Sequence, residues 1–227
     1  MKRMNKQSKP RMHRAPAACV ALASALGLGL ALAGCASSQT GLENRYSTLP
    51  PGARTCSFGP AGELVKLQPG ERCHAHVVAS ERVSLTPLQV DRSERYAVTV
   101  PPNQYWSDAS HTQQPPMGQD GTWLMRRFED WKRVREAKWF ALIATVLDIG
   151  TMSRASTLTR DINCNPEFAV TRQGQLGFFP NDAVAPWGDG DTFYRNNHGE
   201  IWVEVRRLAD DHPVSPDCVA EKDKAGM

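Results

Sequence analysis

Oxygen-bearing side chains gather in one stretch near the C-terminus. Asp182 follows the apolar run 175–180, and Asn196 and Asn197 precede the alternating run 201–205. Two strands joined by this polar connection would bring the three side chains to one end of a sheet. Carboxylate and amide oxygens are ligands that calcium prefers. The stretch therefore predicts a calcium site formed by these three residues.

A second interpretation of the same stretch stays open. Asn-Asp at 181–182 and Asn-Asn-His-Gly at 196–199 are also typical of ordinary turns, because Asn and Gly tolerate positive φ. If calcium binds, one Asp and two Asn supply a single formal negative charge. Such a site would have modest affinity and would leave coordination positions for neutral diol oxygens.

Other reactive side chains do not form a complete metal site or catalytic motif. In Cys73-His74-Ala75-His76 the two histidines would share one face of a strand, but Cys73 would face the other way and a third zinc ligand is lacking. The sequence has no Gly-x-Ser-x-Gly elbow, no His-Glu-x-x-His and no phosphate-binding loop. We therefore predict no catalytic residues and expect a protein that is not an enzyme.

The elements that must position the site are short strands. Apolar or alternating runs separated by turn residues occur at 63–67, 72–78, 83–90, 95–100, 139–146, 168–170, 176–179 and 201–205. Pro87 makes 83–90 an edge strand or two pieces, and the uniformly apolar run 139–146 is typical of a strand buried on both faces. This spacing predicts an all-β fold, a jelly-roll-like β-sandwich.

Two segments between these strands are less regular. Apolar residues recur at near-helical spacing in 124–137, which predicts either one short helix or a long ordered loop. The stretch 111–122 is rich in Gln, Pro, Gly and Asp, and we expect a loop there. The fold is thus predicted to contain at most one short helix.

The N-terminus has the features of a lipoprotein signal peptide. Six basic residues and no acidic residue lie in 1–14, an apolar segment too short for a membrane span follows, and Leu-Ala-Gly-Cys ends at Cys35. That ending resembles the bacterial lipobox, which implies a lipid on Cys35. We therefore expect a chain anchored to the lipid bilayer of the cell envelope, with the outer membrane as its location.

Removing the predicted signal peptide reverses the charge balance. The whole chain carries 27 basic and 24 acidic residues, whereas from Cys35 onward there are 21 basic and 24 acidic. The basic excess thus belongs to the leader, so no nucleic-acid partner is expected. The predicted organisation is signal peptide 1–34, lipidated Cys and flexible tether 35–55, N-terminal strands 56–90, β-sandwich 91–210 and a loose tail 211–227.

Four cysteines follow the predicted lipidation site, and an even number in an oxidising compartment indicates two disulfides. They are Cys56, Cys73, Cys164 and Cys218. Three pairings are possible. We favour Cys56–Cys73 with Cys164–Cys218, because each bond joins neighbours in chain order.

Three blocks of the sequence resemble the bacterial galactophilic calcium-lectin family. They are 94–108, Ala-Lys-Trp-Phe-Ala-Leu-Ile at 137–143, and 174–205 with its pattern Asn-Asp…Tyr-x-Asn-Asn-x-Gly. The resemblance implies a β-sandwich in which calcium binds the side chains of Asp182, Asn196 and Asn197. It also implies two backbone carbonyl ligands, one from Phe193 and one from Asp108 or Ala109, and sugar hydroxyls that complete the coordination.

The chain departs from the family at the sugar contacts. The segment 184–191 lengthens the loop after Asp182, and it contains Trp187, whose flat face suits a sugar ring, and Asp189 and Asp191, which would tighten a calcium site. The family's sugar-contacting His and Gln have no secure match, although His111, Gln113 and Gln114 lie in the corresponding loop. The predicted ligand-binding residues are Asp182, Asn196, His111 and Trp187.

Two functions follow from these observations. The first is an envelope lipoprotein that binds a saccharide or envelope glycan, with calcium as its cofactor. The second is a structural or assembly lipoprotein that keeps the fold, has lost the ligand site and contacts an envelope protein partner. A shared fold does not decide between them, since function depends on the site.

Overall fold

The computed structural model describes residues 47–108, 111–149 and 156–214, without the side chains of 111, 112 and 156–159. The predicted signal peptide, Cys35, Ala109 and residues 215–227 lie outside this part of the chain. The strands are β1 (Arg72–Val78), β2 (Ser84–Val90), β3 (Arg95–Thr99), β4 (Trp106–Asp108), β5 (His111–Gln114), β6 (Met117–Gln119), β7 (Trp139–Leu147), β8 (Ser156–Asp161), β9 (Glu167–Ala169), β10 (Gly174–Pro180) and β11 (Glu200–Arg207). Two short 3₁₀ helices, η1 (Met125–Trp131) and η2 (Tyr194–Asn196), accompany them.

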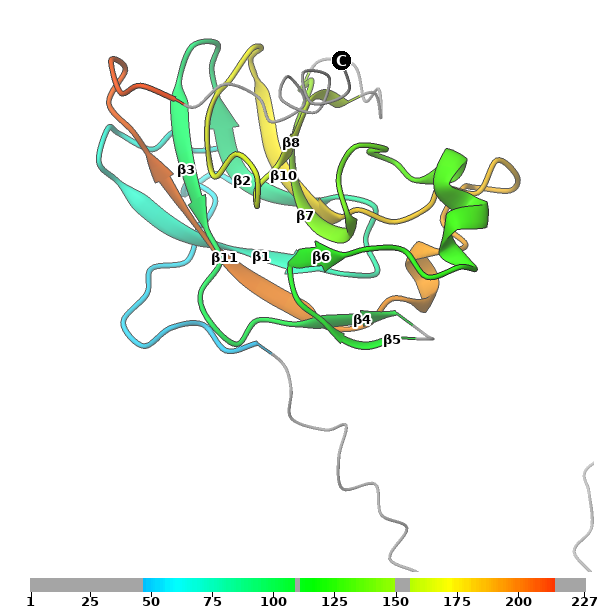
Figure 1. The fold of residues 1–227 in the computed structure, drawn as a ribbon. Coiled ribbons are helices and arrows are strands. Elements are labelled where there is room, and N and C mark those ends of the chain that lie inside the picture. The colour runs from blue at the N-terminus through cyan, green and yellow to red at the C-terminus, as the bar shows by residue number, and fades with distance from the viewer. Residues whose placement is uncertain (1–46, 109–110, 150–155, 215–227) are drawn as a thin grey trace, which may run out of the picture. The chain divides into compact units, whose positions relative to one another are not determined.

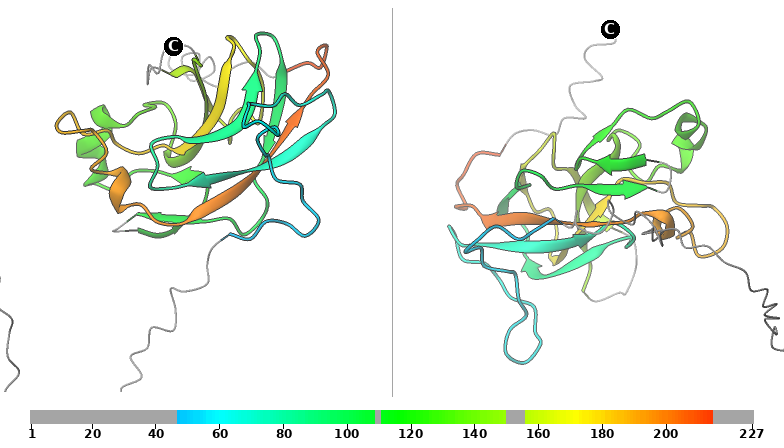
Figure 2. Two further views of the ribbon diagram at one scale, coloured as in Figure 1. Left: turned by 180° about the vertical axis from the view of Figure 1, so that it is seen from behind. Right: turned by 90° about the horizontal axis from the view of Figure 1, so that it is seen from below.

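The strands form an antiparallel sandwich, as predicted. One sheet has the order β1-β11-β3-β9, and the other has the order β2-β10-β7-β6 with β8 also paired to β7. A third, two-stranded sheet consists of β4 and β5. Figures 1 and 2 show β1, β11 and β3 on one side and β2, β10 and β7 on the other. No helix in the described residues is long and apolar enough to span a membrane.

The core lies between the two main sheets. Ile201, Val203 and Val205 of β11 are fully buried, which confirms the alternation predicted for this strand. They belong to one cluster with Leu176 and Phe178 of β10, from the opposite sheet. Burial of such side chains supplies about 1.5–3 kcal/mol each. The face of β11 that carries Trp202 and Glu204 is therefore the outer face.

Strand β7 is buried on both faces, again as predicted. Leu142 and Val146 lie in the main core, whereas Ala141 and Ile143 pack with Phe179 in a second cluster on the other side. This second cluster is closed by Val134 and Val83 among others. A strand covered on both faces has no need for polar alternation, which explains its uniformly apolar sequence.

An N-terminal segment protects one edge of each main sheet. On one side, His74 donates its backbone N–H to Arg54 O (2.7 Å) and accepts from Cys56 N (2.8 Å). On the other side, Val65 donates to Pro87 O (2.8 Å), so β2 is the edge strand that its proline predicted. The strand predicted at 63–67 is wrong, because Val65 makes a single parallel bridge there. The segment thus covers one edge strand of each sheet, β1 and β2, and blocks pairing with other chains there.

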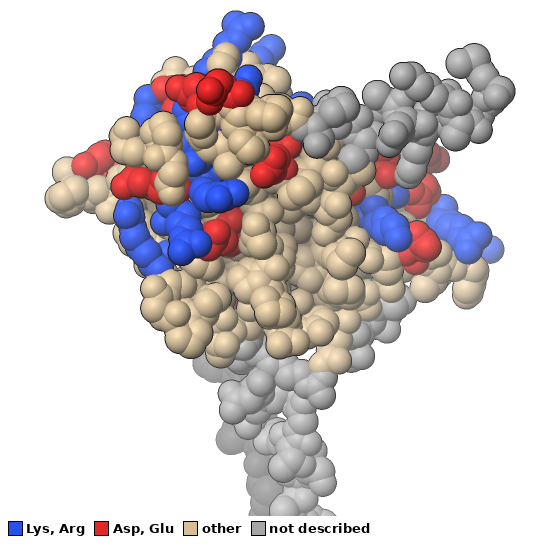
Figure 3. Space-filling model, turned by 60° about the vertical axis from the view of Figure 1, so that its left-hand side comes forward, with Lys and Arg blue, Asp and Glu red and all other residues tan. Residues whose placement is uncertain are grey.

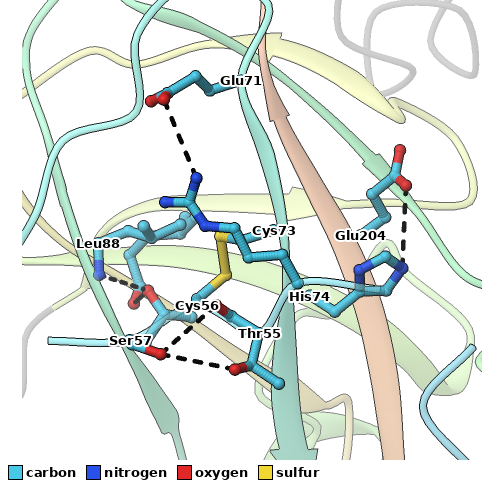
Figure 4. The surroundings of a disulfide bond; sticks show 11 residues. Thr55, Cys56, Ser57, Glu71, Cys73, His74, Leu88 and Glu204 are labelled. Atoms are coloured by element: carbon cyan, nitrogen blue, oxygen red, sulfur yellow. Dashed lines mark hydrogen bonds and ion pairs between the residues drawn. A yellow bond between two sulfur atoms is a disulfide. The ribbon is translucent and has the colours of Figure 1, made fainter. Parts of the chain in front are cut away.

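A disulfide fastens this segment to β1. Cys56 and Cys73 are bonded, which confirms the favoured pairing, and Figure 4 shows the bond joining the two segments. Cys164 is also in a disulfide. Its predicted partner, Cys218, lies outside the described residues.

The irregular segments differ in part from the predictions. Residues 125–131 form η1 and 132–138 continue as an ordered loop, so 124–137 combines the two predicted alternatives. The prediction of a loop at 111–122 is wrong where the chain forms strands β5 and β6. Strand β6 exists because Met117 and Gln119 pair with Ala141 and Trp139 of β7, a long-range contact that its own sequence does not reveal.

The surface carries charges of both signs. On the face seen in Figure 3, Lys and Arg side chains alternate with Asp and Glu, and a wide area between the charged groups is uncharged. The ion pairs of the protein include Lys66–Asp91 and Arg72–Glu204. Interspersed charges favour solubility without a strong field of one sign.

Candidate functional site

The Asn-Asp pair begins where β10 ends. Asn181 is fully buried. Its side chain accepts a hydrogen bond from Val134 N (2.9 Å) and donates to Val134 O (2.8 Å) and Lys138 O (3.0 Å). Asn181 thus ties the loop after η1 to the end of β10. Its role is to hold the backbone that carries Asp182.

A buried tyrosine brings the Asn-Asn pair to the same place. Tyr194, in η2, donates its hydroxyl to Pro180 O at 2.9 Å and is fully buried. Burial raises the pKa of Tyr194 to about 12, so the hydroxyl remains a donor at physiological pH. Since Pro180 lies two residues before Asp182 and Tyr194 two before Asn196, this bond sets the distance between the two halves of the site.

Asp182 and Asn197 are in direct contact. The Asn197 side-chain amide donates to an Asp182 carboxylate oxygen at 2.9 Å, and the other carboxylate oxygen accepts from Ala183 N at 2.7 Å. Both residues are buried. The structure therefore brings together these two of the three predicted side-chain ligands.

Two amide oxygens at this site lack partners. The side-chain carbonyl oxygens of Asn196 and Asn197 are both buried and have no hydrogen-bond partner in the described part of the chain. Buried polar atoms are nearly always satisfied, so each exception needs an explanation, and a bound water or ion is one. Asn197 also has φ −77° and ψ 145°, an extended conformation. Asn197 therefore does not serve as a left-handed turn residue, whereas Gly199, with φ 91°, does, so the turn interpretation holds for part of the stretch.

A second carboxylate acts on the site. The backbones of Ser107 and His198 exchange hydrogen bonds of 2.8 and 2.7 Å, which attaches β4 to the segment after Asn197. The next residue, Asp108, is close enough for its charge to raise the pKa of Asp182. The family resemblance implied Asp108 only as a backbone ligand. Nothing in the sequence indicated that the charge of its side chain would affect Asp182.

The pKa of the Asp182 carboxyl is raised well above its ordinary value. Burial is the largest cause and raises its pKa from 3.8 to about 7, with Asp108 adding to the shift. The hydrogen bonds from Asn197 and Ala183 act in the opposite direction and do not outweigh burial. A cation at this position would compensate the desolvated negative charge.

Two other predicted residues, Phe193 and Trp187, both pack against Trp131. Phe193 immediately precedes η2, and its ring packs against Phe128 (5.6 Å between centroids) and Trp131 (6.3 Å). Trp187 is 54% exposed and meets Trp131 edge-on at 4.9 Å. Ala109 and the side chain of His111 lie outside what the structure describes.

The lengthened loop is held by ion pairs. Asp191 contacts Arg82 at 3.3 Å, and Asp189 is paired with Arg195. These two carboxylates therefore hold the loop in place, and the arginines compete with any calcium for them. Trp187 precedes both of these carboxylates in the chain.

The cysteine–histidine stretch is arranged as expected. Cys73 is in a disulfide, and His74 and His76 lie opposite Glu204 and Trp202 of β11, on the outer face. No cluster of three or more His, Cys, Asp or Glu suited to a metal occurs in the described residues. The amide oxygens of Asn196 and Asn197 belong to other residue types than these four.

Comparisons with known proteins find similarity to a solved structure. No protein-family model matches the chain, and no curated protein matches it. A solved structure, the EclA N-terminal domain described as a PllA-like lectin, is 18% identical over 59% of this chain and 94% of that one, with a TM-score of 0.37. Because that TM-score is too low to carry an argument, the proposals for this chain are built on its own residues.

Proposed function

We propose that this chain is a lipid-anchored protein of the cell envelope whose β-sandwich binds a saccharide through calcium. The observation that carries the proposal is the buried contact of Asp182 with Asn197, beside which Asn196 follows in the chain. A buried carboxylate contacts Asn197, and the carbonyl oxygens of Asn196 and Asn197 are buried without partners. Three such oxygens suit a hard cation.

The residues present fit calcium in type and charge. Asp182, Asn196 and Asn197 would supply side-chain oxygens, and the Phe193 backbone, just before η2, would supply a carbonyl. The charge of Asp108 would add to the attraction for a cation. Bound calcium would accept vicinal sugar hydroxyls as further ligands. The exposed ring of Trp187 would then offer an apolar face to the sugar.

The alternative is a structural or assembly lipoprotein with the ligand site lost. One observation favours it. Both oxygens of the Asp182 carboxylate already accept hydrogen bonds, from Ala183 and Asn197, so the carboxyl has partners without a metal. In that case the fold would serve contacts with an envelope protein.

Thermal unfolding with calcium and with chelator separates the two. A ligand that binds only the native state stabilises it by about 2.7 kcal/mol at a hundredfold excess over its dissociation constant. We expect calcium to raise the unfolding temperature of the wild type and not of Asp182→Ala. The matched control is Asp130→Ala, which removes an exposed carboxylate paired with Arg135 and should keep the response. An identical unfolding temperature with calcium and chelator would favour the assembly role.

Saccharide binding needs its own readout. A glycan array probed with and without calcium should give calcium-dependent binding that Asp182→Ala abolishes. Binding that is equally strong in chelator would rule out a calcium-dependent lectin.

The anchor is tested separately. Cys35→Ala should leave an unlipidated precursor that is lost from the membrane fraction. Normal fractionation of this variant with the outer membrane would contradict lipid anchoring at Cys35.

A further inference from the structure

A cavity lies on the outer face of the first sheet, and none of the proposed calcium ligands lines it. It is a cleft of about 500 Å³ between residues 50–54 and the strands β1, β11 and β3. His74, Glu204 and Thr99 form its floor, because His74 is opposite Glu204 and Glu204 is opposite Thr99 in the strand register. The volume is within the range of small-molecule sites, roughly 300–1,000 Å³.

Two arginines line this cleft, and each is only loosely paired with a glutamate. Arg54 is 4.0 Å from Glu71, and Arg72 is 3.5 Å from Glu204. Both distances exceed the roughly 2.7–2.9 Å of a charge-assisted hydrogen bond. The arginine side chains are 66% and 67% exposed. Such exposed pairs contribute little to stability, so a ligand can replace them at low cost.

The charge of the lining favours one negative charge in the ligand. Arg54, Arg72 and Glu204 are the Arg, Lys, Asp and Glu side chains among the lining residues, and their formal charges sum to +1. An arginine fork matches a planar carboxylate. The apolar walls are Pro50, Pro51 and Pro101, whose rings are rigid.

His74 adds a polar group to the floor. It is 8% exposed, and its Nε2 lies 3.8 Å from the Glu204 carboxylate, which faces it in Figure 4. Its Nδ1 is buried and has no hydrogen-bond partner in the described part of the chain. With Thr99, this imidazole gives the cleft two groups that can bond hydroxyls.

We propose that this cleft binds a sugar acid, a polyhydroxylated molecule with a single carboxylate. The carboxylate pairs with Arg54 and Arg72, and hydroxyls bond His74 and Thr99. The ring packs between the proline walls. This site does not depend on the calcium candidate.

The test is a calorimetric titration of the full chain with glucuronate. Glucose is the matched neutral sugar, and acetate is the matched carboxylate without hydroxyls. We expect glucuronate to bind at one site at least about tenfold more tightly than either. Equal binding of acetate and glucuronate, or no binding of glucuronate, would overturn the proposal.

Variants locate the binding. Arg54→Ala and Arg72→Ala should each weaken glucuronate binding by about tenfold or more, equivalent to about 1.4 kcal/mol. The matched control is Arg135→Ala, which removes an arginine of similar exposure paired with Asp130 and should change nothing. Equal loss in all three variants would indicate an unspecific effect of charge and contradict the site.

Two further variants keep the result unambiguous. Asp182→Asn should retain glucuronate binding, whatever it does to calcium, and loss of glucuronate binding there would assign the ligand to the other site. His74→Gln should weaken glucuronate binding without changing the weak acetate binding. If His74→Gln binds glucuronate as the wild type does, the hydroxyl contact is wrong.

Discussion

The side chains of Asp182 and Asn197 are hydrogen-bonded at 2.9 Å although 15 positions separate them in the chain. This contact closes the connection between β10 and β11 and brings together two of the three predicted oxygen donors. Two buried polar side chains hold it there: Asn181 fixes the backbone before Asp182, and Tyr194 fixes η2. The site is therefore built into the fold before any ligand binds.

Asn181→Ala should strongly destabilise the protein. The substitution leaves Val134 N, Val134 O and Lys138 O without their partner, and each buried unsatisfied group costs about 1–3 kcal/mol. We expect a loss of at least about 3 kcal/mol in the free energy of unfolding, measured by urea denaturation. Asn163→Ala, at an exposed amide that bonds Pro116 O, is the control and should cost less than about 1 kcal/mol. Equal costs would show that Asn181 does not brace the loop.

Tyr194→Phe should separate positioning from folding. It removes only the hydroxyl that donates to Pro180 O, so the free energy of unfolding should fall by about 1–2 kcal/mol. Because η2 carries Asn196, we also expect calcium to bind more weakly. Tyr105→Phe, at a tyrosine that is 39% exposed, should change neither quantity. Unchanged calcium affinity in Tyr194→Phe would contradict the positioning role.

The Cys56–Cys73 bond should stabilise the domain. It closes a loop with a sequence separation of 17, for which chain entropy gives about 3 kcal/mol. Replacing both cysteines by Ser should lower the free energy of unfolding by about that amount in a chemical denaturation series. A loss below about 1 kcal/mol would mean that the hydrogen bonds of Arg54 and Cys56 to His74 hold the segment alone.

Calcium-free protein should lose stability as pH rises from about 4 to about 7. The folded pKa of Asp182 is about 7 and its ordinary value is 3.8, so in this window the folded state holds a proton that the unfolded state has released. Its stabilising contribution is complete below pH 3.8 and is lost as pH passes 7. In chelator, Asp182→Asn should show a flatter pH profile of unfolding free energy than the wild type. Parallel profiles would argue against a raised pKa.

Much of the fold follows from local sequence. The alternation of Ile201, Val203 and Val205 identified β11, and the apolar run of β7 identified a strand buried on both faces. Strands β4, β5, β6 and β8 escaped prediction because they are short or polar and exist through pairing with other strands. Such pairing depends on contacts distant in sequence.

From the sequence, only the oxygen-donating residues of the candidate site could be predicted. Asp182, Asn196 and Asn197 could be chosen because oxygen-bearing side chains stand out between two strands. Asn181 looked like an ordinary turn residue, and only the structure places its amide inside the protein. The charge of Asp108 was missed because its approach depends on the pairing of Ser107 with His198.

The most direct test of the calcium proposal is a crystal structure of the full chain grown with calcium. The account predicts one ion bonded to oxygens of Asp182, Asn196 and Asn197 at about 2.3–2.6 Å. In that state the Asn197 amide would turn its oxygen to the ion. A well-ordered crystal at saturating calcium, with no ion among these three residues and the Asn197 amide still donating to Asp182, would contradict it.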